Sequence, residues 1–149
     1  MKGLRILARR PEMTPDDLVE IELIKQLKAK YFRLMDQKRW DAFSELFTEN
    51  CEQSWQAAPD QPIGGGNGRE GVVSFIRESL AGMRSTHHGH MPEIELTSPT
   101  TAVGIWALYD HCTAEGEMIF DGAGYYRDDY EKVDGRWLIR STRLEAEGF

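Results

Sequence analysis

The 149-residue sequence contains only two cysteines, Cys51 and Cys112, and their spacing matches no metal-binding or redox motif. Basic residues are also few. Lys and Arg number 18 against 25 Asp and Glu, and the resulting net charge of −7 argues against nucleic acid as a partner. No stretch approaches the roughly 20 apolar residues that a membrane span needs, and the apolar run at residues 4–8 is too short for a signal peptide. These absences predict a cytoplasmic protein with reduced thiols, with a Cys51–Cys112 disulfide as the alternative.

Residues 21–40 have the pattern of an amphipathic helix. Apolar side chains recur at steps of three and four, which places them on one face: Ile24, Leu27, Tyr31 and Leu34. The basic side chains are expected on the solvated remainder of the helix: Lys25, Lys28, Lys30 and Arg33. Thr14 and Pro15 are typical of an N-cap and a first helical position, and the helix is expected to end near Asp36. Residues 1–13 are predicted as a flexible arm and residues 14–149 as one domain.

Two shorter helices and then a series of strands are predicted downstream. Asp41 is expected to cap a helix over residues 41–47, and Gly82 to end a helix over residues 69–81. Between them, residues 51–56 appear extended. Residues 57–68 form a predicted loop at the rim of a pocket, whose GGGNG run lacks the Lys-Ser/Thr of a phosphate-binding loop. Strands are predicted at residues 85–91, 92–98, 101–113, 117–120, 125–133 and 136–144, the last two as a hairpin around Asp134-Gly135.

The order of these elements predicts the fold class. Helices come first and antiparallel strands follow, without βαβ alternation or an internal repeat, which indicates an α+β fold. We expect a cone-shaped, curved, mixed or antiparallel sheet with three N-terminal helices that enclose an apolar pocket. A functional site on such a fold is expected in that pocket.

Polar groups interrupt the apolar face of the first helix. Tyr31 places a phenol within the apolar stripe, and Asp36 lies where the helix ends. A buried carboxylate is costly without a partner, and His87 is the best candidate for that partner. The alternatives are a core tyrosine with one satisfied hydroxyl and a solvated helix end.

The strand at residues 101–113 adds a further carboxylate. Trp106, Leu108 and Asp110 share one face because side chains alternate along a strand, and they suit an interior wall. On the last strand the same alternation puts Arg143 on the face of Trp137, where Asp110 could be its acid partner. The alternative is two exposed charges at the edge of the sheet.

Three of the four histidines lie close together at positions 87, 88 and 90. One interpretation is a metal site made from His88, His90 and His111, but no ligand spacing enforces it. The second needs only one imidazole, which can take and return a proton near neutral pH and which a carboxylate can orient. With a tyrosine hydroxyl to stabilise an enolate oxygen and no cofactor motif, this set suits proton abstraction next to a carbonyl, followed by elimination of water or isomerisation. We therefore expect no metal and no cofactor.

The sequence also resembles the SnoaL-like families of the nuclear-transport-factor-2-like (NTF2-like, cystatin-like) superfamily, and within them the bile-acid dehydratase group. The resemblance is densest in IELIKQLKAKYFRLMDQKRWD, STHHGHMPEIEL and YYRDDYEKVDGRWLI. It implies a cone-shaped α+β barrel with a deep apolar pocket. It also implies four site residues, which match Tyr31, Asp36, His87 and Asp110. In these roles His87 would be the general base, Asp36 would orient it, Tyr31 would polarise a carbonyl, and Asp110 would act as the acid.

The sequence departs from these relatives at Trp55, where they have a tyrosine, and in the loop of residues 57–68. Substrate contacts are expected from Trp55, Trp106, Leu108 and Arg143. The leading hypothesis is a cofactor-independent dehydratase acting on a hydroxyl β to a carbonyl of an apolar cyclic molecule such as a steroid, terpenoid or polyketide. The alternatives are a ketosteroid-isomerase-like enzyme and a non-catalytic ligand-binding or structural subunit, such as a ring-hydroxylating dioxygenase small subunit. A homodimer or homotrimer is expected.

Overall fold

The computed structural model describes residues 12–56 and 63–147, so most of the predicted N-terminal arm lies outside the described residues. The elements follow in the order α1 (Pro15–Asp36), α2 (Trp40–Ser44), β1 (Phe47–Gln56), β2 (Gly64–Asn67), α3 (Gly68–Ser79), β3 (Arg84–Ser98), β4 (Thr101–Ala114), β5 (Glu117–Val133) and β6 (Arg136–Glu147).

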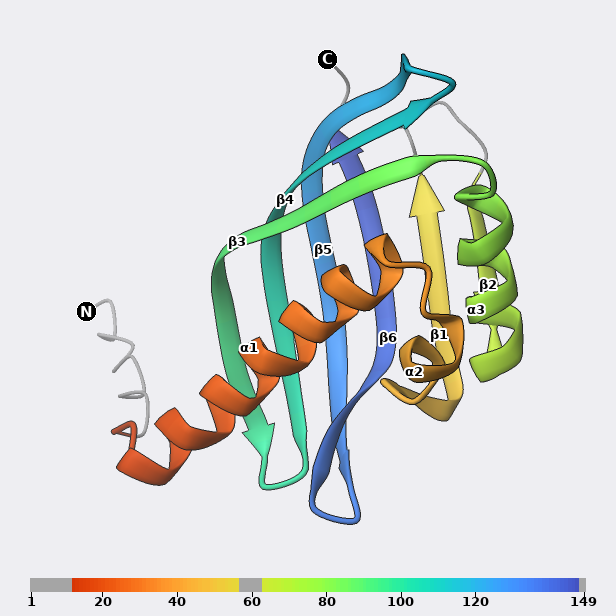
Figure 1. The fold of residues 1–149 in the computed structure, drawn as a ribbon. Helices are drawn as coiled ribbons and strands as arrows, with labels where there is room; N and C mark the ends of the chain where they lie inside the picture. Colours follow the sequence, from red (N-terminus) through yellow and green to blue (C-terminus); the bar gives the residue numbers. More distant parts are fainter. Residues whose placement is uncertain (1–11, 57–62, 148–149) are drawn as a thin grey trace, which may run out of the picture.

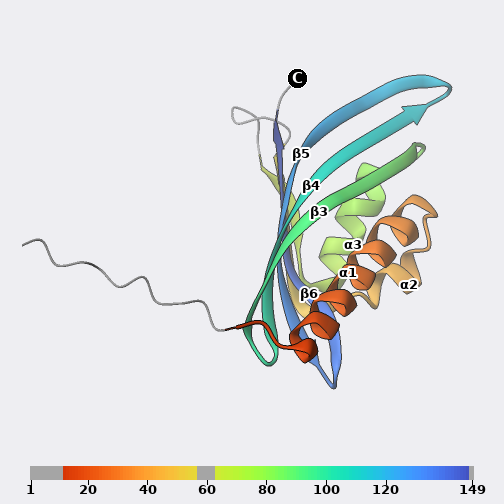
Figure 2. The same cartoon turned by 90° about the vertical axis from the view of Figure 1, so that its left-hand side faces the viewer.

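The strands form one sheet in the order β2-β1-β6-β5-β4-β3. All neighbouring strands are antiparallel except β1 and β6, which are parallel. Figures 1 and 2 show a strongly curved sheet with all three helices on its concave side. The predicted α+β fold with a curved sheet closed by N-terminal helices is therefore confirmed.

Helix α1 begins and ends close to the predicted residues. Thr14 caps it: the Asp17 backbone N–H donates to Thr14 Oγ1 at 3.2 Å, and the Thr14 N–H donates to Asp17 Oδ2 at 2.8 Å. This reciprocal pair satisfies donors that a helix start leaves free. At the other end α1 stops at Asp36, as expected, and this position fixes where the carboxylate lies.

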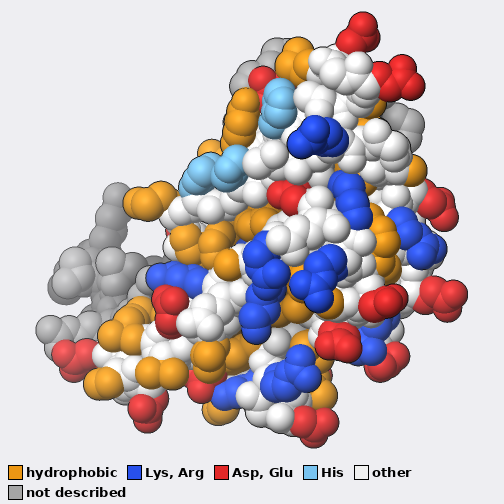
Figure 3. Space-filling view, viewed as in Figure 1, with side chains coloured by type: hydrophobic (Ala, Val, Ile, Leu, Met, Phe, Trp, Pro, Cys, Tyr) orange, Lys and Arg blue, Asp and Glu red, His pale blue; other side chains and the backbone are white. Residues whose placement is uncertain are grey.

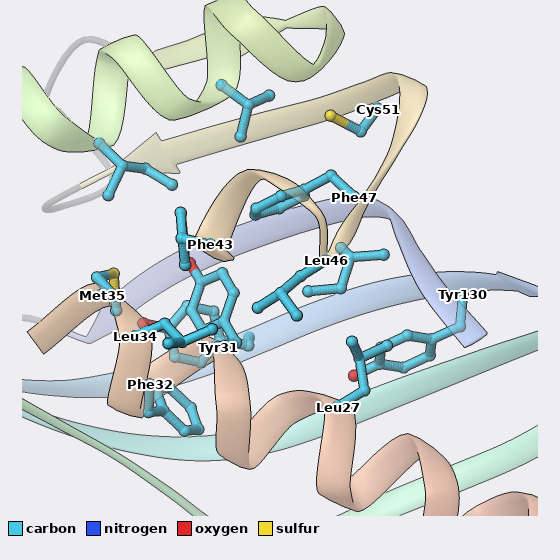
Figure 4. Close-up of a cluster of buried hydrophobic side chains, with 14 of the residues drawn as sticks. Leu27, Tyr31, Phe32, Leu34, Met35, Phe43, Leu46, Phe47, Cys51 and Tyr130 are labelled. Atoms are coloured by element: carbon cyan, nitrogen blue, oxygen red, sulfur yellow. The ribbon is translucent and has the colours of Figure 1, made fainter. Parts of the chain in front are cut away.

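One face of α1 packs on the sheet and on α2. Its predicted apolar residues are all buried, and Figure 4 shows Leu27, Tyr31 and Leu34 among the side chains of this core. Lys28 corrects the prediction, because this residue is fully buried rather than solvated. Its Nζ lies 2.8 Å from Asp128 Oδ2 of β5, so an ion pair offsets the cost of burying the charge.

Several predicted boundaries were wrong. Helix α2 begins at Trp40 rather than after a cap at Asp41, and its N-cap residue, Arg39, makes no side-chain cap hydrogen bond. The predicted loop contains β2 at its end, because Gly64–Asn67 pairs with β1; residues 57–62 lie outside the described part. The two strands expected at residues 117–120 and 125–133 are one strand, β5, because Asp121-Gly122 continues the ladder opposite β4.

The alternation along β6 is shifted by an irregularity. The register with β5 changes between Asp129 and Tyr130, opposite Ile139 and Ser141. Trp137, Ile139 and Thr142 are therefore buried, whereas Arg143 is exposed. A one-residue shift moves every later side chain to the opposite face of a strand. For this reason the predicted face shared by Trp137 and Arg143 was wrong.

On the surface, Lys and Arg side chains gather over the helical side of the molecule, and acidic side chains surround them (Figure 3). Hydrophobic side chains are exposed over the first half of α1, where Leu18 and Val19 each expose 57% of their area. Cys51 and Cys112 are both buried, and neither forms a disulfide. Within residues 12–56 and 63–147, no helix is long and apolar enough to cross a membrane.

Candidate active site

The end of α1 and the start of β3 meet at a histidine–carboxylate pair. Asp36 Oδ1 lies 2.5 Å from His87 Nδ1, and Asp36 Oδ2 accepts the His87 backbone N–H at 2.9 Å. Ser85 donates its hydroxyl to Asp36 Oδ1 at 2.9 Å. Burial alone would raise the pKa of Asp36. The hydrogen bonds from His87 and Ser85 act in the opposite direction and outweigh burial, so the pKa lies below its ordinary value of 3.8. An ionised Asp36 fixes the imidazole with Nδ1–H as donor and leaves Nε2 of the neutral ring free to act as a base.

A second carboxylate lies on the other side of this imidazole. Asp110 Oδ2 of β4 is 4.0 Å from His87 Nε2, and its side chain exposes only 5% of its area. Burial is the main cause that raises the pKa of Asp110, to about 6, although His87 acts in the opposite direction. Asp110 can therefore carry a proton close to neutral pH, as a general acid must.

Two tyrosine hydroxyls belong to the same region. Tyr31 of α1 and Tyr126 of β5 are buried, with ring centroids 6.0 Å apart. Burial, strengthened by the nearby carboxylates Asp110 and Asp128, raises the pKa of Tyr31 well above 10.0. The pKa of Tyr126 is raised in the same direction, also mainly by burial. Both phenols stay protonated at any physiological pH, so they can donate hydrogen bonds but cannot serve as bases.

His87, Asp110 and Tyr31 border a cavity of about 310 Å³ between the helices and the sheet. Its wall is mostly apolar, and the lining residues outside the acid–base group include Met35, Trp55, Phe75, Met83, Phe120 and Leu144. Two buried acceptor oxygens have no hydrogen-bond partner among the described residues and belong to lining side chains: Gln53 Oε1 and Asp110 Oδ1. The site therefore combines an apolar wall with a few polar atoms, a composition typical of small-molecule pockets.

Of the four residues expected to contact substrate, one lines the cavity and three do not. Trp55 lines the cavity. Trp106 and Leu108 are buried core side chains that do not line it, and Trp106 Nε1 donates to Tyr130 OH at 2.9 Å. Arg143 borders a groove on the outer face of the sheet instead, so the expected contact with Asp110 was wrong.

The metal interpretation of the other histidines finds no geometric support. His88 and His90 stack on each other, with ring centroids 5.9 Å apart and planes 7° apart. His111 Nδ1 lies 3.8 Å from Asp121 Oδ1. Across residues 12–56 and 63–147, no three His, Cys, Asp or Glu side chains are grouped to hold a metal ion.

Sequence reasoning missed two features of the site. Tyr126 lines the cavity next to Tyr31, and the alternation of β5 outward from the buried Tyr130 is the signal that could have identified it. The second feature is the cation beneath these rings: Lys28 Nζ lies 3.8 Å from the ring centroid of Tyr126 and 4.3 Å from that of Tyr31. The signal was its spacing: Lys28 lies four residues after Ile24 and three before Tyr31, which places it on the apolar face, whereas Lys25 and Lys30 lie off that face.

The structure therefore combines an NTF2-like cone fold with a histidine that lies between two carboxylates at an apolar cavity. The chain belongs to the SnoaL-like family, whose domain model matches residues 16–143.

Individual relatives agree with this assignment. A protein of Gibberella zeae named "Probable cyclase FGR4" is 24% identical, with 83% of this chain and 88% of that protein covered. The crystal structure of "Putative Scytalone Dehydratase" from Novosphingobium aromaticivorans is 27% identical, with a TM-score of 0.77 and coverage of 91% of this chain and 89% of that one. The hexachlorocyclohexane dehydrochlorinase LinA-type3 from Novosphingobium barchaimii has a TM-score of 0.75 over 90% of each chain; at 18% identity this likeness concerns the fold alone.

Proposed function

We propose that this protein is a cofactor-independent dehydratase that removes a hydroxyl β to a carbonyl from an apolar cyclic substrate, such as a steroid, terpenoid or polyketide. The observation that carries the proposal is the position of His87, bonded to Asp36 at 2.5 Å on one side and 4.0 Å from Asp110 on the other, at an apolar cavity. The relatives named as a cyclase and a dehydratase support a reaction of this general class.

The proposed reaction begins with proton abstraction. His87 Nε2 takes the proton from the carbon next to the carbonyl, and the electron pair of that C–H bond forms an enolate. Tyr31 donates a hydrogen bond to the developing enolate oxygen, which a preorganised donor in a low-dielectric site stabilises strongly. Asp36 stays ionised and stabilises the imidazolium that forms.

The second step breaks the C–O bond. The enolate electrons re-form the carbonyl and make the new C=C bond, and the hydroxyl leaves with the proton of Asp110 as water. His87 then carries one extra proton and Asp110 lacks one. Transfer between these two groups, whose atoms lie 4.0 Å apart, restores the starting state after product leaves.

Two buried acceptors support a hydroxylated substrate. Gln53 Oε1 and Asp110 Oδ1 are without protein partners in the described part of the chain, and an unpaired buried acceptor is costly. A substrate hydroxyl is a donor that could satisfy either of them. The resemblance to the bile-acid dehydratase group stays a prediction. Trp55 stands where that group has a tyrosine and changes the shape of the cavity, so the proposal does not specify a bile acid as the substrate.

An isomerase would share the first step and return the proton to another carbon. An open cavity of about 310 Å³ speaks against a purely structural subunit, whereas a ligand-binding module would also use it; the base and the acid at its border favour the enzyme over that module.

The testing experiment follows enone absorbance with a panel of hydroxylated cyclic ketones and 3-keto steroids. Wild type is compared with His87→Ala and with the control His88→Ala, whose ring lies on the outer face. We expect His87→Ala to lower turnover by about 10²–10⁴-fold, the usual contribution of a general base. His88→Ala should match wild type. Loss of water in the product mass identifies the dehydratase, and an unchanged mass identifies the isomerase. Tight binding without turnover, equal in all three proteins, contradicts both enzymes.

We also propose a homodimer or homotrimer in the cytoplasm, assembled through the outer face of the sheet. Val103, Ile105 and Tyr109 form an apolar stripe along β4, and Val103 and Tyr109 expose 38% and 40% of their area. Glu93 lies on one side of this stripe and Arg127 on the other, in register with Ile105. A second copy rotated about an axis parallel to β4 would place acid against base. A monomer by light scattering at micromolar concentration contradicts this part of the proposal.

A further inference from the structure

The second residue after the end of α1 has a backbone conformation that suits glycine better than lysine. Lys38 has a φ of 57°, in the left-handed region. Its N–H donates to Met35 O at 3.0 Å, and the Arg39 N–H donates to Leu34 O at 2.9 Å. In this type of helix end the left-handed position is usually glycine, because a Cβ there is sterically unfavourable. The backbone alone therefore gives no reason for a lysine.

The side chain of Lys38 supplies a reason. Its Nζ donates to Ser85 Oγ at 2.7 Å, and Ser85 Oγ donates to Asp36 Oδ1 at 2.9 Å. That same carboxylate oxygen is the one bonded to His87 Nδ1. A continuous chain of hydrogen bonds thus runs from the Lys38 ammonium to the imidazole.

We propose that Lys38 is a positioning residue that acts through Ser85 to keep Asp36 ionised and directed at His87. The proposal deepens the proposed function, because it concerns the group that orients the base, and it rests on that function for its effect on turnover. Lys38 touches neither the cavity nor any substrate placed in it.

The other charged or titratable groups near Asp36 explain why a cation is useful there. On β4, the ionised form of Asp110 repels Asp36, and burial together with the negative charges of both carboxylates raises the pKa of the Cys112 thiol. From β5 and α1, the phenols Tyr126 and Tyr31 also experience the charge of Asp36. Both phenols stay protonated, so among these neighbours the ionised form of Asp110 is the group that opposes a negative charge on Asp36. Lys38 and Ser85 counter that effect from the solvent side.

Electrostatic coupling between the two groups agrees with this geometry. Partial burial lowers the pKa of Lys38, and the charge of Asp36 acts against that effect. Because the pKa of Asp36 is lowered, its carboxylate is a weak base and leaves the Nδ1 proton on His87. Proton abstraction by Nε2 depends on this, since Nε2 of the neutral ring is the basic nitrogen only while Nδ1 carries the ring proton.

The experiment compares Lys38→Gly, Lys38→Arg and the control Asp134→Gly in the full chain. Asp134 also has a left-handed φ, 49°, at the β5–β6 turn, so its change to glycine relieves the same kind of backbone cost far from Asp36. Carbon-13 NMR of the Asp36 side chain measures its titration midpoint without any substrate. Thermal unfolding gives Tm, and steady-state kinetics give kcat and KM separately.

We expect Lys38→Gly to raise the Asp36 midpoint by about 0.5–1 unit, since an opposite charge nearby favours the ionised form. Its Tm should stay equal to that of wild type or rise by roughly 2–4 °C, because a residue with φ above zero prefers glycine. Turnover should fall through kcat by about tenfold with KM unchanged, as a loss confined to the chemical step predicts. Lys38→Arg should keep the wild-type Asp36 midpoint, and Asp134→Gly should change neither midpoint nor kcat.

The outcomes separate this inference from the proposed function. An Asp36 midpoint that is the same in Lys38→Gly and wild type overturns the role of Lys38, whatever the activity. A fall in Tm together with kcat indicates that Lys38 only supports the fold, and also overturns it. If wild type turns over none of the substrates while the Asp36 midpoint shifts as expected, the proposed reaction fails and the positioning of Asp36 by Lys38 stands.

Discussion

Lys28 Nζ and Asp128 Oδ2 lie 2.8 Å apart, and neither side chain has any exposed surface. Asp128 is fully engaged, because Tyr130 donates to its Oδ2 at 2.7 Å and Thr142 donates to its Oδ1 at 2.6 Å. The pair joins α1 to β5 and β6 directly beneath the rings of Tyr31 and Tyr126. It therefore supports, from the core side, the two tyrosines that line the cavity, without lining the cavity itself.

The first prediction concerns this ion pair. Lys28→Met leaves an unpaired buried carboxylate and should lower the free energy of unfolding by about 3–5 kcal/mol, as removal of one partner of a buried pair does. Lys28→Met combined with Asp128→Asn should recover most of this loss, because neither charge is then left alone. Urea denaturation measures both. Strictly additive losses in the double variant would contradict the coupling.

The second prediction uses the raised pKa of Asp110. The pKa in the folded protein is about 6 against a usual 3.8, so the folded state binds this proton more tightly than the unfolded chain does. The stability that this group contributes is therefore fully present below 3.8 and is lost as pH rises through about 6. Asp110→Asn mimics the protonated carboxyl and should raise the free energy of unfolding at pH 7 by about 2–3 kcal/mol, at 1.36 kcal/mol for each pKa unit.

Denaturant unfolding at pH 4 and pH 7 checks this prediction, with the exposed Asp41→Asn as a control that should change neither value. In kinetics, the rate of wild type should fall as pH rises above about 6, because Asp110 then loses the proton it must donate. Asp110→Asn should be nearly inactive at every pH. If Asp110→Asn is less stable than wild type at pH 7, the raised pKa of the buried Asp110 carboxyl is contradicted.

The third prediction concerns the shape of the cavity. A Cβ added at Gly122 would lie 2.3 Å from Cζ of Phe120, so the ring must move. Because Phe120 lines the cavity, Gly122→Ala should raise KM for bulky substrates by about tenfold or more, the usual effect of a methylene-sized change in a pocket. Gly71→Ala, where nothing lies within 4 Å of the new Cβ, is the matched control. Phe120→Leu added to Gly122→Ala should restore binding; failure to do so would place the effect elsewhere.

The fourth prediction tests the unpaired oxygen of Gln53. Gln53→Met keeps the side-chain volume and removes a buried acceptor without a partner, a group whose desolvation costs about 1–3 kcal/mol. We expect equal or greater stability than wild type but weaker binding of hydroxylated ligands. Calorimetry with matched hydroxylated and deoxygenated cyclic ketones measures this difference. Equal affinities of wild type and variant for the hydroxylated ketone would exclude a substrate contact at Gln53.

Local signals predicted the parts of the fold that depend on local chemistry. Thr14 and Pro15 set the start of α1, and Asp134-Gly135 set the β5–β6 turn, because caps and tight turns depend on few residues. The alternation of Trp106, Leu108 and Asp110 correctly placed a carboxylate inside the sheet. With the helix end at Asp36, this alternation located the two carboxylates that lie on either side of His87.

The errors arose where distant partners decide the outcome. Helical spacing places Lys28 on the apolar face of α1, but its burial with a charge depends on Asp128, a hundred positions later, which no local pattern connects to it. Arg143 points outward because the β5–β6 register shifts next to Asp129, and the sequence of β6 contains no signal for this shift. The role of Lys38 is hidden for the same reason, because Ser85 comes from another element.

The strand order has a consequence for how the chain reaches its folded state. Strand β6 is the last in the sequence, yet it lies between β1 and β5 and joins the first half of the sheet to the second. During synthesis on the ribosome, β1 and β2 therefore have no bridge to β3, β4 and β5 until residues 136–147 have emerged. Contacts of such long sequence separation form slowly. Helix α1 can pack on α2 and β3 before then, so the step that waits for the end of the chain is the joining of the two halves of the sheet through β6.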